Sequence, residues 1–423
     1  GDDASLTQPY YLMARPAGAF YSWPPGRRDL WSQPFGPAWL NAEFQLDGGG
    51  WTRREVTFRY VDQGLGEVRR PVRVVPRVAV TLSPGSGLWA MGDGAKEFTV
   101  TLRHAVTATV RGVVSLELPK GWTGGSARPF LLAGATERQF RFPVEPAPGS
   151  SGRFEVRAVA RDESGHQYDV GVEKVEYPHI QARQLLRTAE AVITVAPVTL
   201  PAGVRAGYVR GAADRIPEAL TALGMELVLL GPDSLLRGDL SRFQTIVVGP
   251  RAYEIEPAVA AANERLLAFA RAGGTLVVQY QQQVYFQGGF APSPLAMTET
   301  VGAVPPFRVS APRVAEEDAA VTVLRPGHPA LSRPNRIEAA DWDGWVQERG
   351  LYFARSWAPT WIPLLSMADR GEAPLQGALL VAPVGRGLCV YTGLSFFRQL
   401  PAAVPGATRL FLNLLALRAG DGG

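Results

Sequence analysis

The stretch TIVVGPRAYEIEP, residues 245–257, decides the fold class of the second half of this chain. Four β-branched residues end at a Gly-Pro pair, and a charged and aromatic cluster of Arg251, Tyr253 and Glu254 comes directly after it. A helix-like run, AVAAANERLLAFARAGG, follows. This order predicts a buried strand that carries polar side chains to the open end of a sheet, where α/β proteins bind their ligands.

Strand-like and helix-like segments alternate on both sides of this stretch. The strand-like runs VRAGYVRG, MELVLLG, TLVVQY and LCVYTGLSF are continuously apolar, and DRIPEALTALG has helical character, with Asp214 expected as its N-cap. Strands that are apolar throughout have both faces covered, which is typical of parallel sheets flanked by helices. We therefore expect residues 198–423 to form a doubly wound parallel sheet with flavodoxin-like layering. Residues 256–274 are expected as one long helix, and ALLVAPVGRG with LCVYTGLSF as a β-hairpin or edge pair.

The chain has a different pattern before residue 200. Segments such as RVAVTL, KEFTVTLRHAV and GRFEVRAVARD alternate apolar and polar residues and are bounded by Gly, Pro and Asp. Alternation with a period of two predicts antiparallel β-sandwich strands. The strand that leads into a Trp-bearing turn at LELPKGWTGG favours an immunoglobulin-like sandwich over residues 76–197. Clear strands begin only at about Asn41, and one strand pair is too little for a domain. We expect residues 1–75 to be the tail of a truncated first β-sandwich.

The composition excludes several classes of protein. The 423 residues are 46% hydrophobic and 19% charged, with a formal net charge of +4. No apolar run reaches the ~18 residues of a membrane-spanning helix, and the basic residues do not form the stripe of a nucleic-acid-binding protein. With one cysteine, Cys389, and four histidines that lack metal-ligand spacing, we expect no internal disulfide and no zinc site in this chain.

Five segments carry a family resemblance. They are GYVRGAADRIPEALTALG, DLSRFQTIVVGPRAYE, LLAFARAGGTLVVQYQQ, NRIEAADWDGWVQERGLYFARSW and VYTGLSFFRQLPAAVPGATRLFLNLLAL. In this order they resemble the C-terminal part of large bacterial PIG-L (LmbE-like) deacetylases. In that family a zinc-dependent N-acetyl-sugar deacetylase domain is followed by β-sandwich modules and by a class I glutamine amidotransferase-like domain. The AHPDDE-type motif that marks the deacetylase domain does not occur in this sequence.

The resemblance implies that this chain is the non-catalytic portion of such an enzyme. Zinc would then be the cofactor of the missing deacetylase domain only, and that domain of the same polypeptide would be the partner. The resemblance also implies a secreted or periplasmic location. Residues 198–423 would be an amidotransferase-like domain, which needs a thiolate on the turn after TLVVQY. The sequence has Tyr280, Gln281, Gln282 and Gln283 at this turn. Cys389 is expected as a buried strand thiol, so we expect no glutamine hydrolysis.

Polar side chains nevertheless gather where the predicted strands end. Such residues line the ligand crevice of an open α/β sheet, so a small polar ligand such as a sugar fits the pattern. We favour the alternative, an arginine–carboxylate network that seals an inactive pocket or docks a neighbouring domain. The candidate residues are Arg210, Asp214, Arg251, Tyr253, Glu254, Gln279, Gln281, Ser395, Arg398 and Gln399.

The segment DWDGWVQERGLYFARSW, residues 341–357, is a second candidate because it combines three Trp residues with carboxylates. Trp342, Trp345 and Trp357 with Glu348 are expected to form either a carbohydrate-stacking surface or a domain contact, where Trp and Arg are favoured anchors.

Three hypotheses therefore remain for function. The first is an accessory region that docks or supports a PIG-L-type deacetylase domain and is catalytically silent by itself. The second is a stand-alone carbohydrate-binding module, and the third is a hydrolase that uses strand-end carboxylates such as Glu254 and Glu348.

Overall fold

The computed structural model describes residues 5–17, 20–177, 179–298 and 311–422, and it is a β-rich, multidomain fold as predicted. Contacts between residues divide the chain into two compact units. The first consists of residues 1–85, 94–147 and 155–191, and the second of residues 86–93, 148–154 and 192–423. The predicted division into three domains stays a prediction.

Up to Ala196 the described chain forms strands and two short 3-10 helices. In chain order these are η1 (Tyr10–Leu12), η2 (Arg28–Leu30), β1 (Asn41–Gln45), β2 (Trp51–Glu55), β3 (Thr57–Asp62), β4 (Gly66–Pro71), β5 (Val78–Ser83), β6 (Ser86–Ala90), β7 (Lys96–His104), β8 (Val110–Glu117), β9 (Arg128–Leu132), β10 (Glu137–Val144), β11 (Gly152–Asp162), β12 (Gln167–Tyr168), β13 (Val170–Val175), β14 (Arg183–Thr188) and β15 (Glu190–Ala196).

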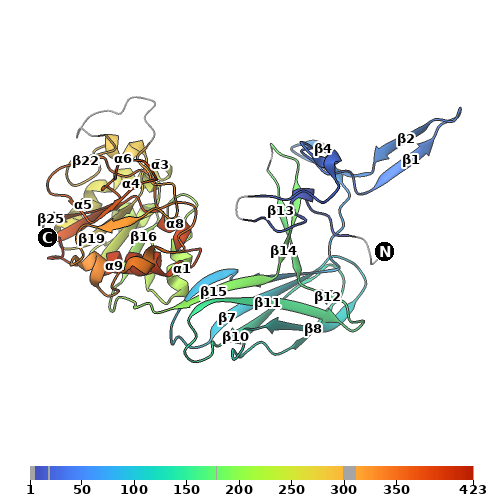
Figure 1. Ribbon diagram of the computed structural model, residues 1–423, viewed down its shortest axis with the longest axis horizontal. Helices are drawn as coiled ribbons and strands as arrows, with labels where there is room; N and C mark the ends of the chain where they lie inside the picture. Colours follow the sequence, from blue (N-terminus) through green and yellow to red (C-terminus); the bar gives the residue numbers. More distant parts are fainter. Residues whose placement is uncertain (1–4, 18–19, 178, 299–310, 423) are drawn as a thin grey trace. The chain divides into compact units, whose positions relative to one another are not determined.

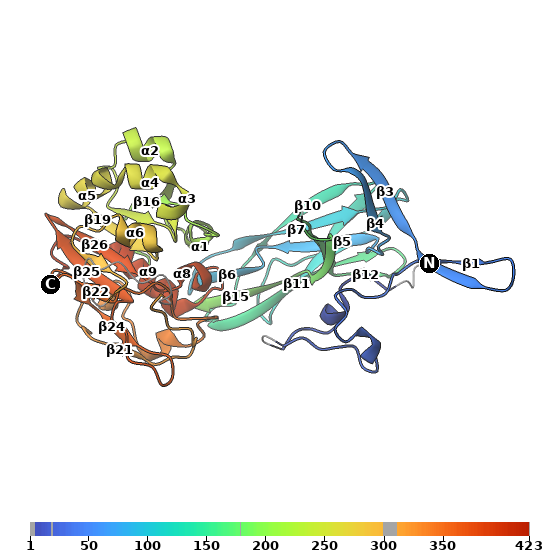
Figure 2. The ribbon, with the colours of Figure 1, turned by 90° about the horizontal axis from the view of Figure 1, so that it is seen from above.

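Two sheets are formed by strands with a buried apolar face. One has the order β10-β7-β5, which Figure 2 shows side by side, and the other has the order β6-β15-β11-β8-β9 with β12 paired to β11. In β7 the side chains of Phe98, Val100 and Leu102 are fully buried, whereas the residues between them are partly exposed. Successive side chains of a strand point to opposite faces, so this alternation places one face of the sheet in a core.

The N-terminal residues form hairpins without a core of their own. β1 begins at Asn41, as predicted, and pairs only with β2, while β3 pairs with β4 (Figure 1). Before Val78 the buried large hydrophobic side chains of the described chain are Tyr10 and Leu30. Isolated hairpins are marginally stable in water, so these residues depend on contacts with other parts of a protein.

From Ala206 onward strands and helices alternate. The elements are β16 (Ala206–Val209), α1 (Ile216–Ala222), β17 (Leu227–Leu229), α2 (Pro232–Arg237), β18 (Thr245–Val248), α3 (Ala252–Ile255), α4 (Pro257–Ala261), α5 (Asn263–Arg271), β19 (Thr275–Gln279), α6 (Gln283–Gln287), β20 (Leu295–Ala296), β21 (Val321–Val323), α7 (Pro329–Ser332), η3 (Ala339–Trp342), β22 (Ser356–Trp357), β23 (Ile362–Pro363), β24 (Leu365–Met367), β25 (Leu379–Val384), β26 (Gly387–Thr392), α8 (Phe396–Gln399) and α9 (Pro405–Ala416).

A seven-stranded sheet forms the centre of the second unit. Its order is β17-β16-β18-β19-β26-β25-β23, in which the first five strands are parallel and the last two are added through antiparallel pairings. Every residue of β16, β18, β19 and β26 is buried. The sequence TIVV is therefore continuously apolar because both of its faces are covered.

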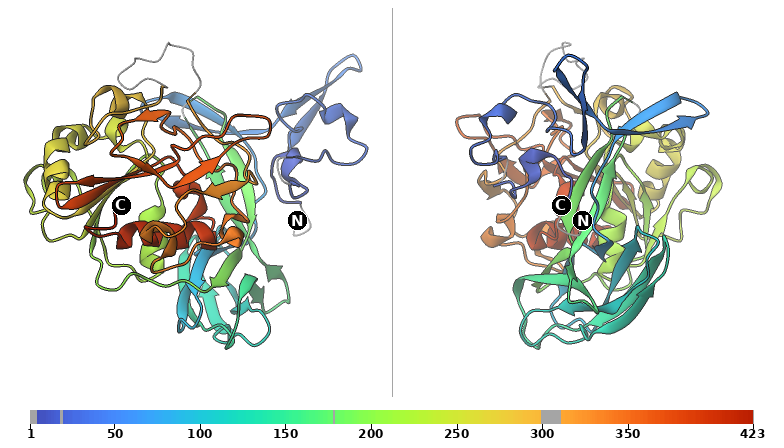
Figure 3. Two further views of the ribbon diagram at one scale, coloured as in Figure 1. Left: turned by 60° about the vertical axis from the view of Figure 1, so that its left-hand side comes forward. Right: turned by 90° about the vertical axis from the view of Figure 1, so that its right-hand side faces the viewer.

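Helices cover both faces of this sheet (Figure 3). Val247, Val277 and Val390 lie opposite one another in register and pack with α1, α8 and α9. Their neighbours Val248 and Val278 point to the other face and pack with α3, α4 and α5.

The expected long helix at 256–274 is wrong, because two short helices, α4 and α5, replace it. Glu256 is extended (φ −126°, ψ 98°), and its carboxylate accepts a hydrogen bond from Ala258 N at 3.0 Å, which starts a new helix with Pro257 in its first turn. Asn263 then starts α5, and its side chain accepts a hydrogen bond from the Tyr253 hydroxyl at 2.6 Å. Asp214 does not hold the N-cap position of α1 either. Arg215 does, although Asp214 Oδ1 accepts from Ile216 N at 3.1 Å.

Candidate functional site

The predicted polar residues do follow the strands of the central sheet, but hydrogen bonds distribute them into three separate groups. The first group follows β16. The Gln279 amide donates to the Tyr208 hydroxyl at 2.8 Å, and this hydroxyl donates to Asp214 Oδ2 at 2.8 Å. All three side chains are buried. Arg210, predicted beside Asp214, donates to the Asp214 carbonyl at 2.5 Å, pairs with the Glu218 carboxylate at 2.7 Å and is partly exposed.

Close packing fixes the position of Asp214. A Cβ atom added to Gly249 would lie 2.4 Å from Asp214 Oδ2, so only glycine fits at the end of β18. Burial raises the pKa of Asp214, although the hydrogen bonds from Gly211 N, the Tyr208 hydroxyl and Ile216 N lower it. A buried carboxyl that accepts three hydrogen bonds from the surrounding chain is a structural centre of this loop.

The second group follows β18 and β19. Gln281 is fully buried, donates to the Gly249 and Gln279 carbonyls at 2.8 and 2.9 Å, and accepts from Tyr253 N at 3.1 Å. Glu254 accepts from Gln282 N at 2.7 Å. Burial raises the pKa of Glu254, against the effect of that hydrogen bond and of Arg251.

The third group follows β26. Ser395 donates to the Glu348 carbonyl at 2.8 Å, and Arg398 pairs with the Glu348 carboxylate at 2.6 Å. Gln399 is fully buried, accepts from Val346 N at 2.8 Å and donates to Ser395 Oγ at 2.9 Å. These contacts fasten the loop before Arg349 to the end of the sheet.

A strand-to-helix turn with a left-handed residue follows β18 and not β19, where the turn of an amidotransferase-like domain is expected. Arg251, directly after β18, has φ +57° and ψ 23°, and α3 starts at the next residue. None of residues 280–283, between β19 and α6, has a positive φ. A non-glycine residue in this region is strained, and the Arg251 N–H is held by the Tyr280 carbonyl at 2.9 Å. The strand-to-helix elbow of this sheet therefore carries an arginine.

The aromatic residues of this end of the sheet were missed from the sequence. The rings of Tyr280 and Tyr352 stack at 5.6 Å with an interplanar angle of 6°, and Phe397 lies 5.2 Å from Tyr280. Gln282 also donates to the Tyr352 hydroxyl at 2.8 Å. The sequence places Tyr280 where a thiolate is expected, and Tyr352 lies inside the candidate segment 341–357, whose pattern is carried by its Trp and acidic residues.

The predicted aromatic surface at 341–357 is wrong. Trp342 and Trp345 are only 6% and 3% exposed and belong to the core below the sheet, where their rings lie 5.5 Å apart. The Trp345 indole N–H donates to the Asp341 carbonyl at 3.0 Å. Trp357, in β22, is partly buried and packs against the core on the other face. No flat face of Trp342 or Trp345 is open for a sugar ring.

Cys389 is fully buried in β26, between Leu276 and Ala382 of the neighbouring strands. Burial raises the pKa of its thiol to about 12. His328 is also buried, and its Nδ1 accepts from Ala330 N at the start of α7. Among the described residues no three His, Cys, Asp or Glu side chains gather to hold a metal ion. None of the helices in the described ranges is long and apolar enough to cross a membrane.

Replacing Tyr208 with Phe is expected to lower the free energy of unfolding of the second unit by about 1–3 kcal/mol, because the buried Gln279 amide loses its partner. Urea unfolding followed by helical circular dichroism measures this. Tyr352→Phe is the matched control, since the Tyr352 hydroxyl accepts a similar bond in a partly exposed position, and it should cost less than about 1 kcal/mol. Equal costs at the two positions would contradict the buried network.

Comparisons with known proteins do not assign a family. No family model matches the sequence, and no curated protein matches it. Among solved structures, α2-macroglobulin of Salmonella reacted with methylamine is 16% identical with a TM-score of 0.21, over 31% of this chain and 8% of that chain. Escherichia coli α2-macroglobulin activated by porcine elastase has the same identity and TM-score over 31% of this chain and 10% of that chain. The apo form of the Calx CBD1 domain is 13% identical with a TM-score of 0.17, over 28% of this chain and 99% of that chain. TM-scores this low carry no functional argument.

Proposed function

We propose that this chain is the accessory region of a PIG-L-type deacetylase. In this proposal residues 76–197 are an immunoglobulin-like sandwich and residues 198–423 an amidotransferase-like domain without hydrolytic activity. Residues 1–75 dock the zinc-dependent deacetylase domain of the same polypeptide, and the whole protein is secreted or periplasmic. The family part of the proposal rests on the resemblance of the five sequence segments.

The topology of the second unit supports the proposed fold. Numbered by their order in the chain, the five parallel strands follow the spatial order 2-1-3-4-5, which is that of flavodoxin-like sheets. In such a sheet the ligand crevice lies beyond the carboxyl ends of the strands. At that edge of this sheet Asp214, Gln281 and Gln399 are occupied by internal hydrogen bonds. Internal hydrogen bonding of this kind supports a structural role for these residues.

The observation that carries the docking proposal is the distribution of exposed hydrophobic side chains. Fourteen of the twenty-five exposed large hydrophobic residues in the described chain lie between Met13 and Leu65. Trp51 and Phe58, for example, are 67% and 61% exposed. Single exposed apolar residues are common, but this density marks a surface that another protein or domain covers.

The chemistry of this surface favours a protein partner over a ligand. Aromatic residues are enriched in protein interfaces, and eight of the fourteen exposed residues are Phe or Trp. Salt bridges such as Arg53–Glu43 and Arg69–Glu67 lie on the same hairpins and are largely exposed. An apolar centre with a charged rim is the usual organisation of a docking surface.

Hydrogen–deuterium exchange tests the docking proposal. The chain would be compared alone and together with the AHPDDE-bearing domain encoded by the same reading frame. We expect the amides of β1 to β4 to exchange more slowly in the presence of that domain. A reading frame without such a domain, or exchange that is unchanged at saturating concentration, contradicts the proposal.

Two leucines provide matched variants for the same complex. Leu46 is 52% exposed on the β1–β2 hairpin, and Leu229 is 51% exposed on β17. Leu46→Asp is expected to weaken binding of the deacetylase domain by about tenfold, or about 1.4 kcal/mol, whereas Leu229→Asp is not. Titration calorimetry measures both, and equal effects would place the interface elsewhere.

A further inference from the structure

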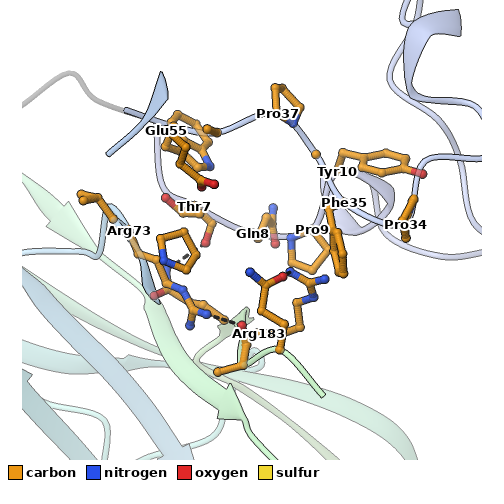
Figure 4. Close-up of a pocket in the computed structure, with 18 of the residues that line it drawn as sticks. Thr7, Gln8, Pro9, Tyr10, Pro34, Phe35, Pro37, Glu55, Arg73 and Arg183 are labelled. Carbon is orange, nitrogen blue, oxygen red and sulfur yellow. Dashed lines mark hydrogen bonds between the residues drawn. The ribbon is translucent and has the colours of Figure 1, made fainter. Parts of the chain in front are cut away.

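A cavity of about 180 Å³ lies within the first unit, and the function proposed above does not use it. It is enclosed by the N-terminal segment around Gln8, the loop around Phe35, the chain after β4 and the start of β14 (Figure 4). Figure 4 shows the labelled side chains arranged around an open centre, with Arg73 and Arg183 on the side of the β14 strand.

Both arginines lack a carboxylate partner among the described residues. Arg73 donates to the Ala182 carbonyl, and Arg183 donates to the Gln181 amide oxygen at 3.0 Å. Burial lowers the pKa of both guanidinium groups, and the positive charges of Arg183 and Arg70 lower that of Arg73 further. Partly buried positive charges without a counter-charge destabilise a protein, so an anion placed between them would be stabilising.

The charges around the cavity leave it positive. Glu176 lies close enough to Arg73 to oppose the lowering of its pKa, but it already pairs with Arg70 and with Lys174. Glu55 is the one acidic residue of the described cavity lining, and its side chain is exposed. An anionic ligand therefore meets two arginines and a single carboxylate at the rim.

The cavity is held open by contacts that do not involve a ligand. The Gln184 amide is buried and donates to the carbonyls of Thr7 and Val74 at 2.9 and 3.1 Å, which fastens the N-terminal segment. The Tyr10 hydroxyl donates to the Gln33 carbonyl at 2.8 Å. A site that is already formed loses little conformational entropy when it binds.

The aromatic wall orients one of the charges. The guanidinium carbon of Arg183 lies 3.8 Å from the centre of the Phe35 ring, so one planar face of this group is covered by the ring. Stacking of this kind fixes the plane of the guanidinium and leaves its edge for hydrogen bonds, and arginine binds planar carboxylates through two parallel bonds. The rings of Tyr10 and Trp39 and the neighbouring prolines supply flat apolar surface beside it.

We propose that this cavity binds the carboxylate of a small acidic ligand, with Arg183 and Arg73 holding the carboxylate and the aromatic wall holding the ring of the ligand. A uronic acid has both features, namely a carboxylate and a ring that packs on aromatic surface. The inference concerns the chain itself, and Phe35 and Trp39 of the aromatic wall also belong to the exposed residues of the docking proposal.

Titration calorimetry at low ionic strength tests the site with four probes: glucuronate, glucose, acetate and sulfate. We expect saturable binding of glucuronate, weaker binding of acetate and none of glucose. Tighter binding of sulfate than of glucuronate would contradict selection of a planar carboxylate. The absence of saturable binding of every probe would overturn the proposal.

Variants separate the two arginines from general surface charge. Arg183→Gln and Arg73→Gln should each weaken glucuronate binding by about 10–100-fold, since each loses charged hydrogen bonds of about 1.5–3 kcal/mol. Arg59→Gln is the control, because Arg59 is 73% exposed and pairs with Glu67. If all three variants lost the same amount of glucuronate affinity, the effect would come from net charge alone, which would contradict the site.

A variant that is expected to strengthen glucuronate binding keeps the test valid if an arginine variant fails to fold. Glu55→Gln removes the negative charge at the rim and is expected to tighten glucuronate binding severalfold. Unchanged or weaker binding by folded Glu55→Gln protein would contradict the placement of the anion in this cavity.

Discussion

Cys389 in the native chain is expected to react with a maleimide about a thousandfold more slowly than in the denatured chain at the same pH. The thiolate is the reactive form of cysteine. Burial raises the pKa of the Cys389 thiol from 9.0 to about 12, and each pKa unit reduces the thiolate fraction about tenfold near neutral pH. The side chain is also fully buried, so a reagent reaches it only after local opening of β26.

Mass spectrometry of the intact chain over time measures this rate. The chain has a single cysteine, so every added maleimide reports on Cys389. Alkylation of the native chain at a rate close to that of the denatured chain would contradict the buried position. It would also make Cys389 a candidate nucleophile.

Trp345→Ala is expected to lower the free energy of unfolding of the second unit by about 3–5 kcal/mol, the usual cost of removing a large buried aromatic side chain. The centre of the Trp345 ring lies 5.5 Å from that of Trp342 and 6.2 Å from that of Phe396. The guanidinium carbon of Arg349 lies 5.5 Å from the centre of the Trp345 ring. The truncation leaves a cavity at the point where the loop meets α8.

Helical circular dichroism during urea unfolding measures this cost, since the α-helices of the described chain all lie in the second unit. Trp39→Ala is the control, because Trp39 is 44% exposed and should change this transition by less than about 0.5 kcal/mol. A stable Trp345→Ala variant that has lost binding to an oligosaccharide would contradict the core position and restore the predicted stacking surface.

Hydrophobic periodicity predicted the strands because the pattern of apolar residues in a strand follows which of its faces are buried. In TIVV and TLVVQ both faces are covered, so the sequence is apolar at every position, whereas in KEFTVTLRH only alternate residues are buried. The two periods distinguish a strand with two covered faces from a strand with one.

The candidate site was harder to predict because polar residues are not always exposed. Arg349 is only 3% exposed, and its guanidinium donates to the Ala319 and Trp342 carbonyls, while the buried Asp341 pairs with Arg409 at 2.8 Å. Partners such as Ala319 and Arg409 lie outside the segment, so the composition of 341–357 does not distinguish a surface from a core.

Two further features depend on single backbone angles or on distant partners. The helical pattern of 256–274 is divided at Ala262 (φ −90°, ψ 1°), a position that carries neither Gly nor Pro. Arg73 and Arg183 are more than a hundred residues apart and meet only in the folded chain, around the cavity. Sequence periodicity contains neither kind of information.

The central claim is that the described residues at the end of the α/β sheet provide no nucleophile for glutamine hydrolysis. Release of ammonia from glutamine by the purified chain tests it most directly, with Cys389→Ser as the reference. The account predicts no ammonia release above that of Cys389→Ser. Glutamine hydrolysis that disappears in Cys389→Ser would contradict it.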